Sequence, residues 1–263
     1  MDFRQTKRIF IVAFLCLNIF LLFLILERRD VLNPVMQNSI NIVQEMSEEN
    51  IKGPRLEEKN LEVPYLLADP FNVAVEKDGD VEWLNVKDGQ ASKPIPIYQS
   101  IPTLNKAGKR DLGPLENFMK SSFLKGDDYE FVAYYKAKRE IVYAQKINGV
   151  PILDGTGQVT FYLNNDYRVV SYLATHVDHL QRQDTKKQTI TQKKAVEILY
   201  VNNLLPSNSR IETATLAYHQ ILKLKDMTVY SPVWYFDILN DGALTTQRVD
   251  ATSGKIITSE MRK

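Results

Sequence analysis

An apolar run near the N-terminus constrains this chain more than any other feature. From Ile9 to Leu26 there are 18 consecutive residues, and only Asn18 among them has a polar side chain. As an α-helix the run would be about 27 Å long, which is close to the roughly 30 Å hydrocarbon core of a bilayer. We therefore predict a transmembrane helix over residues 9–26, preceded by a short N-terminus of residues 1–8.

The flanks of this run indicate a permanent anchor whose N-terminus is cytoplasmic. Charged residues 27–30 follow the run directly, where a cleaved signal peptide would have small residues. Cys16 follows a leucine and not a small residue, so we do not expect a lipoprotein processing site. Three basic residues precede the run and two follow it, and the cytoplasmic flank carries the excess. The sequence thus predicts a single-pass protein of the cell membrane with an extracytoplasmic C-terminal part.

The rest of the chain has the composition of a globular protein. Charged residues make up 25% and hydrophobic residues 44% of the sequence, so a packed core is expected and general disorder is not. The net charge of +1 gives no reason to expect a nucleic-acid partner. The sequence contains no cysteine besides Cys16, which excludes an intramolecular disulfide and zinc sites of the cysteine type.

The region after the run begins as a connector. We assign residues 27–65 to a juxtamembrane linker, in which "VMQNSINIVQEMSEENI" has a loose helical rhythm compatible with a short amphipathic helix. Residues 66–111 follow as an irregular or β segment. Within it, Asp78 and Gly79 indicate a hairpin between two apolar stretches.

Residues 112–180 are predicted to form a first unit of one helix and an antiparallel sheet. Pro114 opens a helix whose face carries Leu115, Phe118 and Met119 at helical spacing. Four strands are predicted, at residues 129–137, 140–147, 158–163 and 168–174. In the third strand, Phe161 and the apolar residues two positions away alternate with polar ones, which is the period of a half-buried strand.

Residues 187–260 are predicted to form a second unit of the same order. Thr189 and Thr191 are alternative N-caps of a helix that carries Ile198 and Leu199 on one face. Strands are predicted at residues 210–224, 230–239 and 245–249. A helix followed by a meander, twice over, indicates the α+β class with the helices on one face of their sheets.

An aromatic stretch of this second unit has two interpretations. Trp234, Phe236 and Ile238 share one side of a predicted strand. We expect them in the core, and an exposed aromatic contact patch is the competing interpretation.

The residues that could act in catalysis or metal binding lack the additional motif residues or ligands that such sites need. His176 and His179 form an H-x-x-H pair without further metal ligands at compatible spacing, and His219 is expected on a sheet surface. Ser122 and Lys125 match S-x-x-K, the nucleophile motif of penicillin-recognising enzymes, but the companion S-D-N and K-T-G motifs are absent. We therefore predict no catalytic residue, no metal site and no cofactor.

Asn18 is the one candidate contact residue within the apolar run. Its amide would be poorly satisfied in lipid, whereas against a partner helix it could hydrogen-bond across the interface. The sequence leaves equally open that Asn18 hydrogen-bonds the backbone of its own helix.

Four stretches stand in a characteristic order along the chain. They are "TKRIFIVAFLCLNIFLL", "YAQKINGVPILDGTGQVTFYLNNDYRVVSY", "KKAVEILYVNNLLP" and "SPVWYFDI". In this order the chain resembles the YycI (WalI) family of membrane-anchored regulators of the YycFG (WalRK) two-component system in low-GC Gram-positive bacteria. The two units also resemble PepSY-type modules, with "QRVDATSGKII" as a closing strand, turn and strand.

This resemblance implies regulation without catalysis. It implies that the extracytoplasmic part pairs with a YycH-like membrane protein, while the transmembrane helix contacts those of a YycG (WalK) sensor histidine kinase that serves cell-wall metabolism. The family supplies no active-site residue that could be carried over to this sequence.

Two other classes of function remain open. PepSY-like domains also occur in propeptides that inhibit metallopeptidases, so an envelope module that binds or inhibits a protease is the alternative. We count against it that no peptidase domain precedes the end of the chain at Lys263. The third class is an envelope enzyme, and co-purification from membranes would discriminate among the three.

Overall fold

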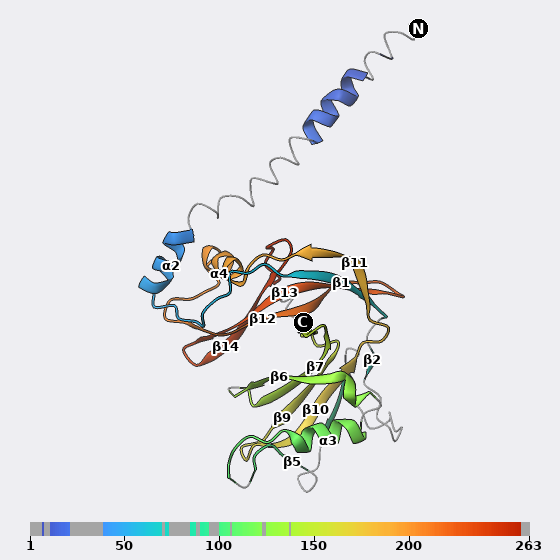
Figure 1. Cartoon of the computed structure of the whole chain (residues 1–263), viewed down its shortest axis with the longest axis vertical. Helices are drawn as coiled ribbons and strands as arrows, with labels where there is room; N and C mark the ends of the chain where they lie inside the picture. Colours follow the sequence, from blue (N-terminus) through green and yellow to red (C-terminus); the bar gives the residue numbers. More distant parts are fainter. Residues whose placement is uncertain are drawn as a thin grey trace.

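The structure is a computed structural model that describes most of the chain beyond residue 38. The described residues are 7, 11–21, 39–69, 72–73, 85–87, 90–94, 100–105, 107–122, 125–136 and 138–258. They form a mixed α+β fold dominated by antiparallel strands in two sheets (Figure 1). The predicted α+β class is confirmed.

The elements have the following bounds. The helices are α2 (Ser39–Glu48), α3 (Gly113–Ser122), the 3-10 helix η3 (Gly126–Asp128) and α4 (Gln192–Val201). The strands are β1 (Glu62–Ala68), β2 (Asn72–Val73), β3 (Asn85–Lys87), β4 (Gln90–Pro94), β5 (Ile101–Pro102), β6 (Tyr129–Tyr135), β7 (Glu140–Ile147), β8 (Val150–Pro151), β9 (Gln158–Leu163), β10 (Arg168–His176), β11 (Gln181–Gln188), β12 (Arg210–Lys223), β13 (Thr228–Asn240) and β14 (Ala243–Asp250).

The first sheet is built around the meander that follows α3. Strands β6, β7, β9 and β10 are neighbours in chain order, and each pairing is antiparallel. Their ends agree with the four predicted strands to within two residues. Strands β2, β4 and β5 pair with the other edge of β10, and β3 pairs with β4. The segment before α3 therefore widens this sheet.

Helix α3 covers one face of the first sheet. Leu115 and Met119 of the helix are buried in one cluster with Phe161 and Tyr172 of the sheet. Phe118 meets Phe161 edge to face, with ring centroids 6.3 Å apart. The apolar helix face predicted from the sequence is confirmed.

Strand β13 is the centre of the second sheet. It pairs with β12 along one edge and with β1 and then β14 along the other, while β11 lies beyond β1. Helix α4 covers one face, where Trp234, Phe236 and Ile238 are buried in one cluster with Leu199. Their predicted place in the core is confirmed. Thr191 is the N-cap of α4, and its hydroxyl accepts a first-turn N–H at 3.0 Å.

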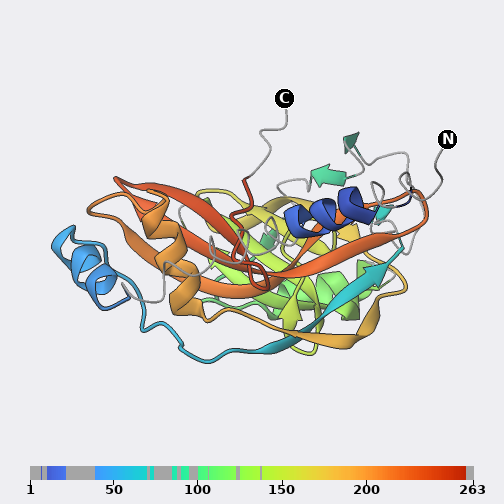
Figure 2. The ribbon, with the colours of Figure 1, turned by 90° about the horizontal axis from the view of Figure 1, so that it is seen from above.

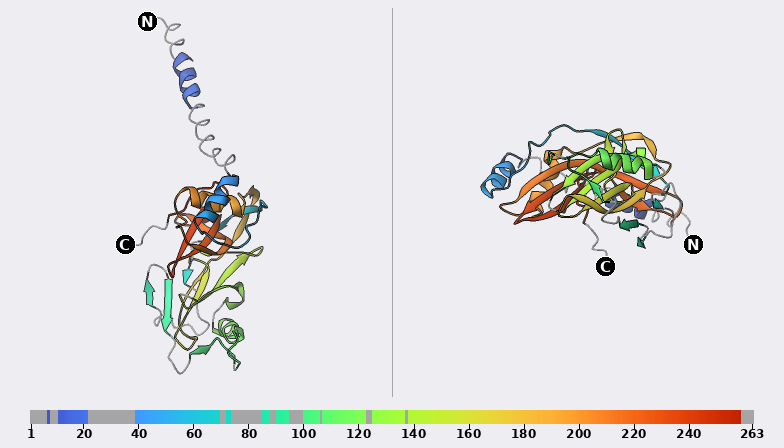
Figure 3. Two further views of the ribbon diagram at one scale, coloured as in Figure 1. Left: turned by 90° about the vertical axis from the view of Figure 1, so that its left-hand side faces the viewer. Right: turned by 90° about the horizontal axis from the view of Figure 1, so that it is seen from below.

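The two sheets pack against each other with α3 and α4 on their outer sides, an arrangement that the sequence analysis did not predict. Tyr218 of β12 and Tyr230 of β13 are buried in one cluster with Ile152 and Val177 of the first unit. The long β12–β13 hairpin crosses over the strands of the first sheet (Figure 2), and the side view shows the sheets as stacked layers (Figure 3). Each sheet is therefore covered on both faces over part of its area.

Part of the predicted juxtamembrane linker is folded onto the second unit. Helix α2 lies within it, as the helical rhythm allowed, and β1 begins at Glu62, inside the range assigned to the linker. Between them, the Leu61 N–H donates to the Thr189 hydroxyl at 3.0 Å, and the Glu57 N–H donates to the Gln192 side chain at 2.8 Å. These contacts use backbone groups, which the charged composition of the segment does not reveal.

Two predictions fall partly or wholly outside the described residues. Asp78 and Gly79, the predicted hairpin turn, lie outside them. Residues 11–21 of the apolar run are described and are helical. In the described part of the chain, no helix combines the length and the apolar character needed to cross a membrane.

Candidate functional site

Asn18 lies on the helix of residues 11–21, where large apolar side chains are 47–67% exposed. Its Nδ2 donates a hydrogen bond to the backbone carbonyl of Phe14 at 2.9 Å. This is the intrahelical arrangement that the sequence left open beside a contact to a partner helix. A side-chain amide has two N–H donors and a carbonyl acceptor, so further hydrogen-bonding capacity stays on this exposed surface.

Helix α2 joins the N-terminal part of the chain to the second unit. Met46 and Ile51 pack in the same cluster as Leu199 of α4. Beside them, the Glu49 carboxylate accepts hydrogen bonds from Ser207 at 2.7 Å and from Tyr200 at 2.8 Å. These two hydrogen bonds lower the pKa of Glu49 below its ordinary value. The segment that follows residue 38 is thus held on the second unit.

The loop between β8 and β9 ties the first unit to the second sheet. Asp154 Oδ2 accepts the backbone N–H of Gln220 in β12 at 2.6 Å. Its other carboxylate oxygen accepts the N–H of Thr156, and the Thr156 hydroxyl lies 2.9 Å from the hydroxyl of Tyr230. One loop therefore contacts both long strands of the second sheet.

The chain segment that leaves β10 is held by Gln145 of β7. Its Oε1 accepts the Val177 N–H at 2.8 Å, and its Nε2 donates to the Val177 carbonyl at 3.0 Å. The neighbouring His176 is buried, with Nε2 at 2.8 Å from the Asp128 carboxylate and Nδ1 at 3.4 Å from that of Asp178. A buried imidazole thus lies between two carboxylates where the chain leaves β10 toward the second unit. We call this segment, which begins at Val177, the crossing.

The H-x-x-H pair does not converge on one point. His179 is exposed and hydrogen-bonds Asp69, which raises the pKa of His179. His176 instead is buried between Asp128 and Asp178. Among the residues that the structure describes, no group of three or more His, Cys, Asp or Glu side chains could hold a metal ion.

The two residues of the S-x-x-K match also have different partners. The Ser122 hydroxyl lies 3.5 Å from that of Ser121. Lys125 pairs with Asp178, and this ion pair lowers the pKa of the Asp178 carboxyl. Lys125 and His176 therefore share Asp178 as a neighbour.

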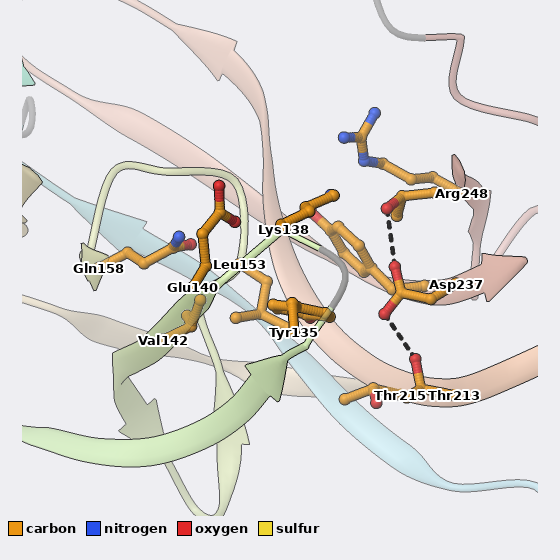
Figure 4. Close-up of a pocket in the computed structure, with 12 residues that line it drawn as sticks. Tyr135, Lys138, Glu140, Val142, Leu153, Gln158, Thr213, Thr215, Asp237 and Arg248 are labelled. Carbon is orange, nitrogen blue, oxygen red and sulfur yellow. Dashed lines mark hydrogen bonds between the residues drawn. The ribbon is translucent and has the colours of Figure 1, made fainter. Parts of the chain in front are cut away.

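A polar cleft of about 170 Å³ lies where the two sheets do not fill the space between them (Figure 4). Asp237 of β13 lines it and is 4% exposed, and its two carboxylate oxygens accept hydrogen bonds from Thr213 and Thr246 at 2.7 Å each. From the first sheet, Tyr135 and Glu140 line the other side. Burial raises the pKa of both groups, and the nearby Asp237 carboxylate adds to the effect at Tyr135.

His219 lies in β12, on a sheet face as the sequence predicted. It is half-buried, and its Nδ1 lies 2.7 Å from the Tyr235 hydroxyl. Burial lowers the pKa of His219. The guanidinium of Arg248 lies 5.5 Å from the centroid of the same Tyr235 ring.

Comparisons with known proteins decide the family. A family model described as "YycI protein" matches residues 32–252, which is most of the chain. The chain belongs to the YycI family. Membership in the YycI family implies regulation of the YycFG two-component system. No curated protein matches the chain.

Two solved structures have a remote likeness to this YycI-family chain. The Bacillus megaterium YpeB C-terminal domain is 14% identical; the match covers 84% of this chain and 94% of that domain, with a TM-score of 0.33. An uncharacterized protein from Eubacterium rectale is 10% identical, with 66% of this chain covered and a TM-score of 0.32. The chain spans about half, 51%, of the length of that second protein.

The sequence analysis singled out His176 and Lys125 for other reasons, but it did not single out Gln145 or the residues that line the cleft. The alternation in "SPVWYFDI" puts Asp237 on the strand face opposite Trp234, and that signal could have pointed to a carboxylate between two layers. Gln145 and Arg248 carry no comparable signal, because their roles depend on segments distant in the sequence.

Proposed function

We propose that this chain is a non-enzymatic, membrane-anchored regulator of a YycG (WalK) sensor histidine kinase that controls cell-wall metabolism. The family match over residues 32–252 is the observation that carries the proposal. The apolar run of residues 9–26 and its basic flanks support a single transmembrane helix with a cytoplasmic N-terminus. The folded part then lies outside the membrane of a Gram-positive cell.

Two contacts would carry the regulation. The transmembrane helix contacts the helices of the kinase, with Asn18 as the candidate polar contact, and the folded part pairs with a YycH-like membrane protein. The packing of α2 on α4 supports a connection between these two contacts, because a displacement of the folded part is then passed to the chain at residue 39. A loosely attached folded part would only tether the helix.

The two helix-and-sheet units are PepSY-like in this proposal, and that likeness also underlies the alternative function. A PepSY-like envelope module could bind or inhibit a protease. The family match favours kinase regulation, because the family implies the YycFG system.

Co-purification from membranes separates the two functions. The full chain carries an affinity tag, is extracted in mild detergent, and its partners are identified by mass spectrometry. We expect a sensor histidine kinase and a YycH-like protein. A matched control replaces residues 9–26 by an unrelated apolar span and should lose the kinase while keeping the YycH-like protein. Recovery of a protease without either partner would support the alternative.

A further inference from the structure

Arg248 of β14 brings a positive charge to the inter-sheet cleft, and one of its N–H groups is unsatisfied. Within the described part of the chain, its Nε is buried and has no hydrogen-bond partner. Its guanidinium lies against the Tyr235 ring, 5.5 Å from the ring centroid. A buried N–H group without a hydrogen-bond partner is costly. This arrangement therefore favours the arrival of an anion.

The nearest carboxylate on the same sheet does not fill this need. Asp237 is directed to the Thr213 and Thr246 hydroxyls, one on each carboxylate oxygen (Figure 4). Among the described residues we find no ion pair between Asp237 and Arg248. The Arg248 Nε–H is thus available to a ligand, while Asp237 is held by its own sheet.

A second cation reaches the cleft from the other sheet. Lys138 lies in the turn between β6 and β7, and its Nζ is 5.5 Å from the centroid of the Tyr135 ring. Figure 4 shows Lys138 between Glu140 on one side and Arg248 on the other. One cation from each sheet therefore borders the cleft, and an anion between them would form charge-assisted hydrogen bonds to both layers.

The remaining lining suits hydroxyl groups. Glu140, Gln158 and Thr215 border the cleft with hydrogen-bonding side chains, and a carboxylate or an amide oxygen accepts a hydroxyl proton well. The cleft volume of 170 Å³ equals that of about six water molecules in the liquid. A small organic molecule fits this volume, whereas a polymer chain could not be fully buried in it.

We propose that the cleft between the sheets binds a small hydroxylated organic anion, a sugar acid or a polyol phosphate. Its charged group lies between Arg248 and Lys138, and its hydroxyls bind Glu140, Gln158 and Thr215. Because the ligand contacts both sheets, its binding stabilises their stacking. A ligand at this position would give the folded part of the chain a way to respond to a soluble molecule, which goes beyond the proposed contacts with kinase and partner.

The test uses the full chain in detergent and two charged probes with one neutral control. The probes are gluconate for the carboxylate class and glycerol 3-phosphate for the phosphate class, and glycerol is the control. Binding is measured by calorimetry and by the rise in melting temperature, since a ligand that binds only the folded state raises it. We expect at least one probe to bind, and glycerol not to bind. The probe that binds assigns the anion class.

Three variants locate the binding. Arg248→Met and Lys138→Gln should each raise the Kd of the bound probe about tenfold or more, because each removes a charge-assisted hydrogen bond. Lys186→Gln, which makes the same charge change on the exposed strand β11, should bind as the parent does.

Two results would overturn the proposal. The first is that neither gluconate nor glycerol 3-phosphate binds the parent at millimolar concentration. The second is binding that survives in both Arg248→Met and Lys138→Gln.

Discussion

The Tyr200 hydroxyl of α4 donates a hydrogen bond to the Glu49 carboxylate at 2.8 Å, across 151 positions of the sequence. Ser207 donates to the other oxygen of the same carboxylate at 2.7 Å. Glu49 follows α2 directly in the sequence, so these contacts hold the end of α2 on the second unit. If the chain transmits a change between membrane and folded part, this attachment is where the change must pass.

The attachment should weaken in acid. The folded-state pKa of Glu49 lies below the ordinary value of 4.5, so its ionised form stabilises the fold fully above pH 4.5, and this stabilisation is lost as the pH falls through the folded-state pKa. Glu49→Gln should therefore melt below the parent at neutral pH and approach it in acid. Melting temperature against pH measures this.

Glu48→Gln is the matched control for that series. The Glu48 carboxylate accepts its hydrogen bond from Gln44 within α2, so its loss should leave the melting curve close to that of the parent at every pH. Equal pH profiles for Glu49→Gln and the parent would contradict the role given to Glu49.

Phe161→Ala should cost about 3–5 kcal/mol of the free energy of unfolding, because it opens a cavity in the core under α3. Phe161 is fully buried and contacts Phe118, Tyr143 and Tyr172 ring to ring. Denaturant unfolding of the full chain measures the loss. Phe131→Ala on β6 is the control, since Phe131 is 37% exposed and should cost much less. Equal costs for both would refute the assigned core face.

The sequence was informative where one face of an element meets a core formed by its own neighbours. Phe161 in β9 and Trp234 in β13 follow the period of two, and both helices follow the helical period, so these elements and their outer cores were predictable. Thr191 was predictable as an N-cap because the cap contact lies within one turn of the helix.

The stacking of the two sheets was not predictable in the same way. Val233 and Tyr235 are buried on the second face of β13, and the near-continuous apolar run that results is typical of a strand buried on both sides. That signal was present but does not name the covering layer. Strand β11 gives no apolar signal, since each of its residues is exposed, and it pairs with β1 in an antiparallel ladder. The cleft depends on the stacking of the two sheets and was therefore not predictable from the sequence.

Gln145→Leu should destabilise the crossing between the units. The leucine would leave the buried N–H and carbonyl of Val177 without the partners at 2.8 and 3.0 Å, and each unsatisfied group costs about 1–3 kcal/mol. In Gln145→Leu, the rate of hydrogen exchange at the Val177 N–H should rise by a larger factor than the rates at the N–H groups of β13. Gln158→Leu, on the neighbouring strand, is the control. Unchanged protection at Val177 would show that Gln145 does not hold the crossing.

Asn18→Leu should weaken association with partner helices while leaving the melting of the folded part unchanged. Interhelical hydrogen bonds of this kind contribute about 0.6–2 kcal/mol, so a change of a few-fold in regulated output is expected. The bond to the Phe14 carbonyl uses one of the two N–H groups of Asn18, which leaves the other for a partner. Output identical to the parent at matched protein levels would remove Asn18 from the mechanism.

The central claim is that this YycI-family chain regulates the kinase of a YycFG system, and a reporter gene controlled by the cognate response regulator tests it most directly. Reporter output is compared in cells that have the full chain, cells that lack it, and cells in which it is restored from a second copy. We predict that output changes when the chain is removed, returns when it is restored, and does not return when residues 9–26 are replaced by an unrelated apolar span at matched protein levels. Equal output with and without the chain would contradict the account.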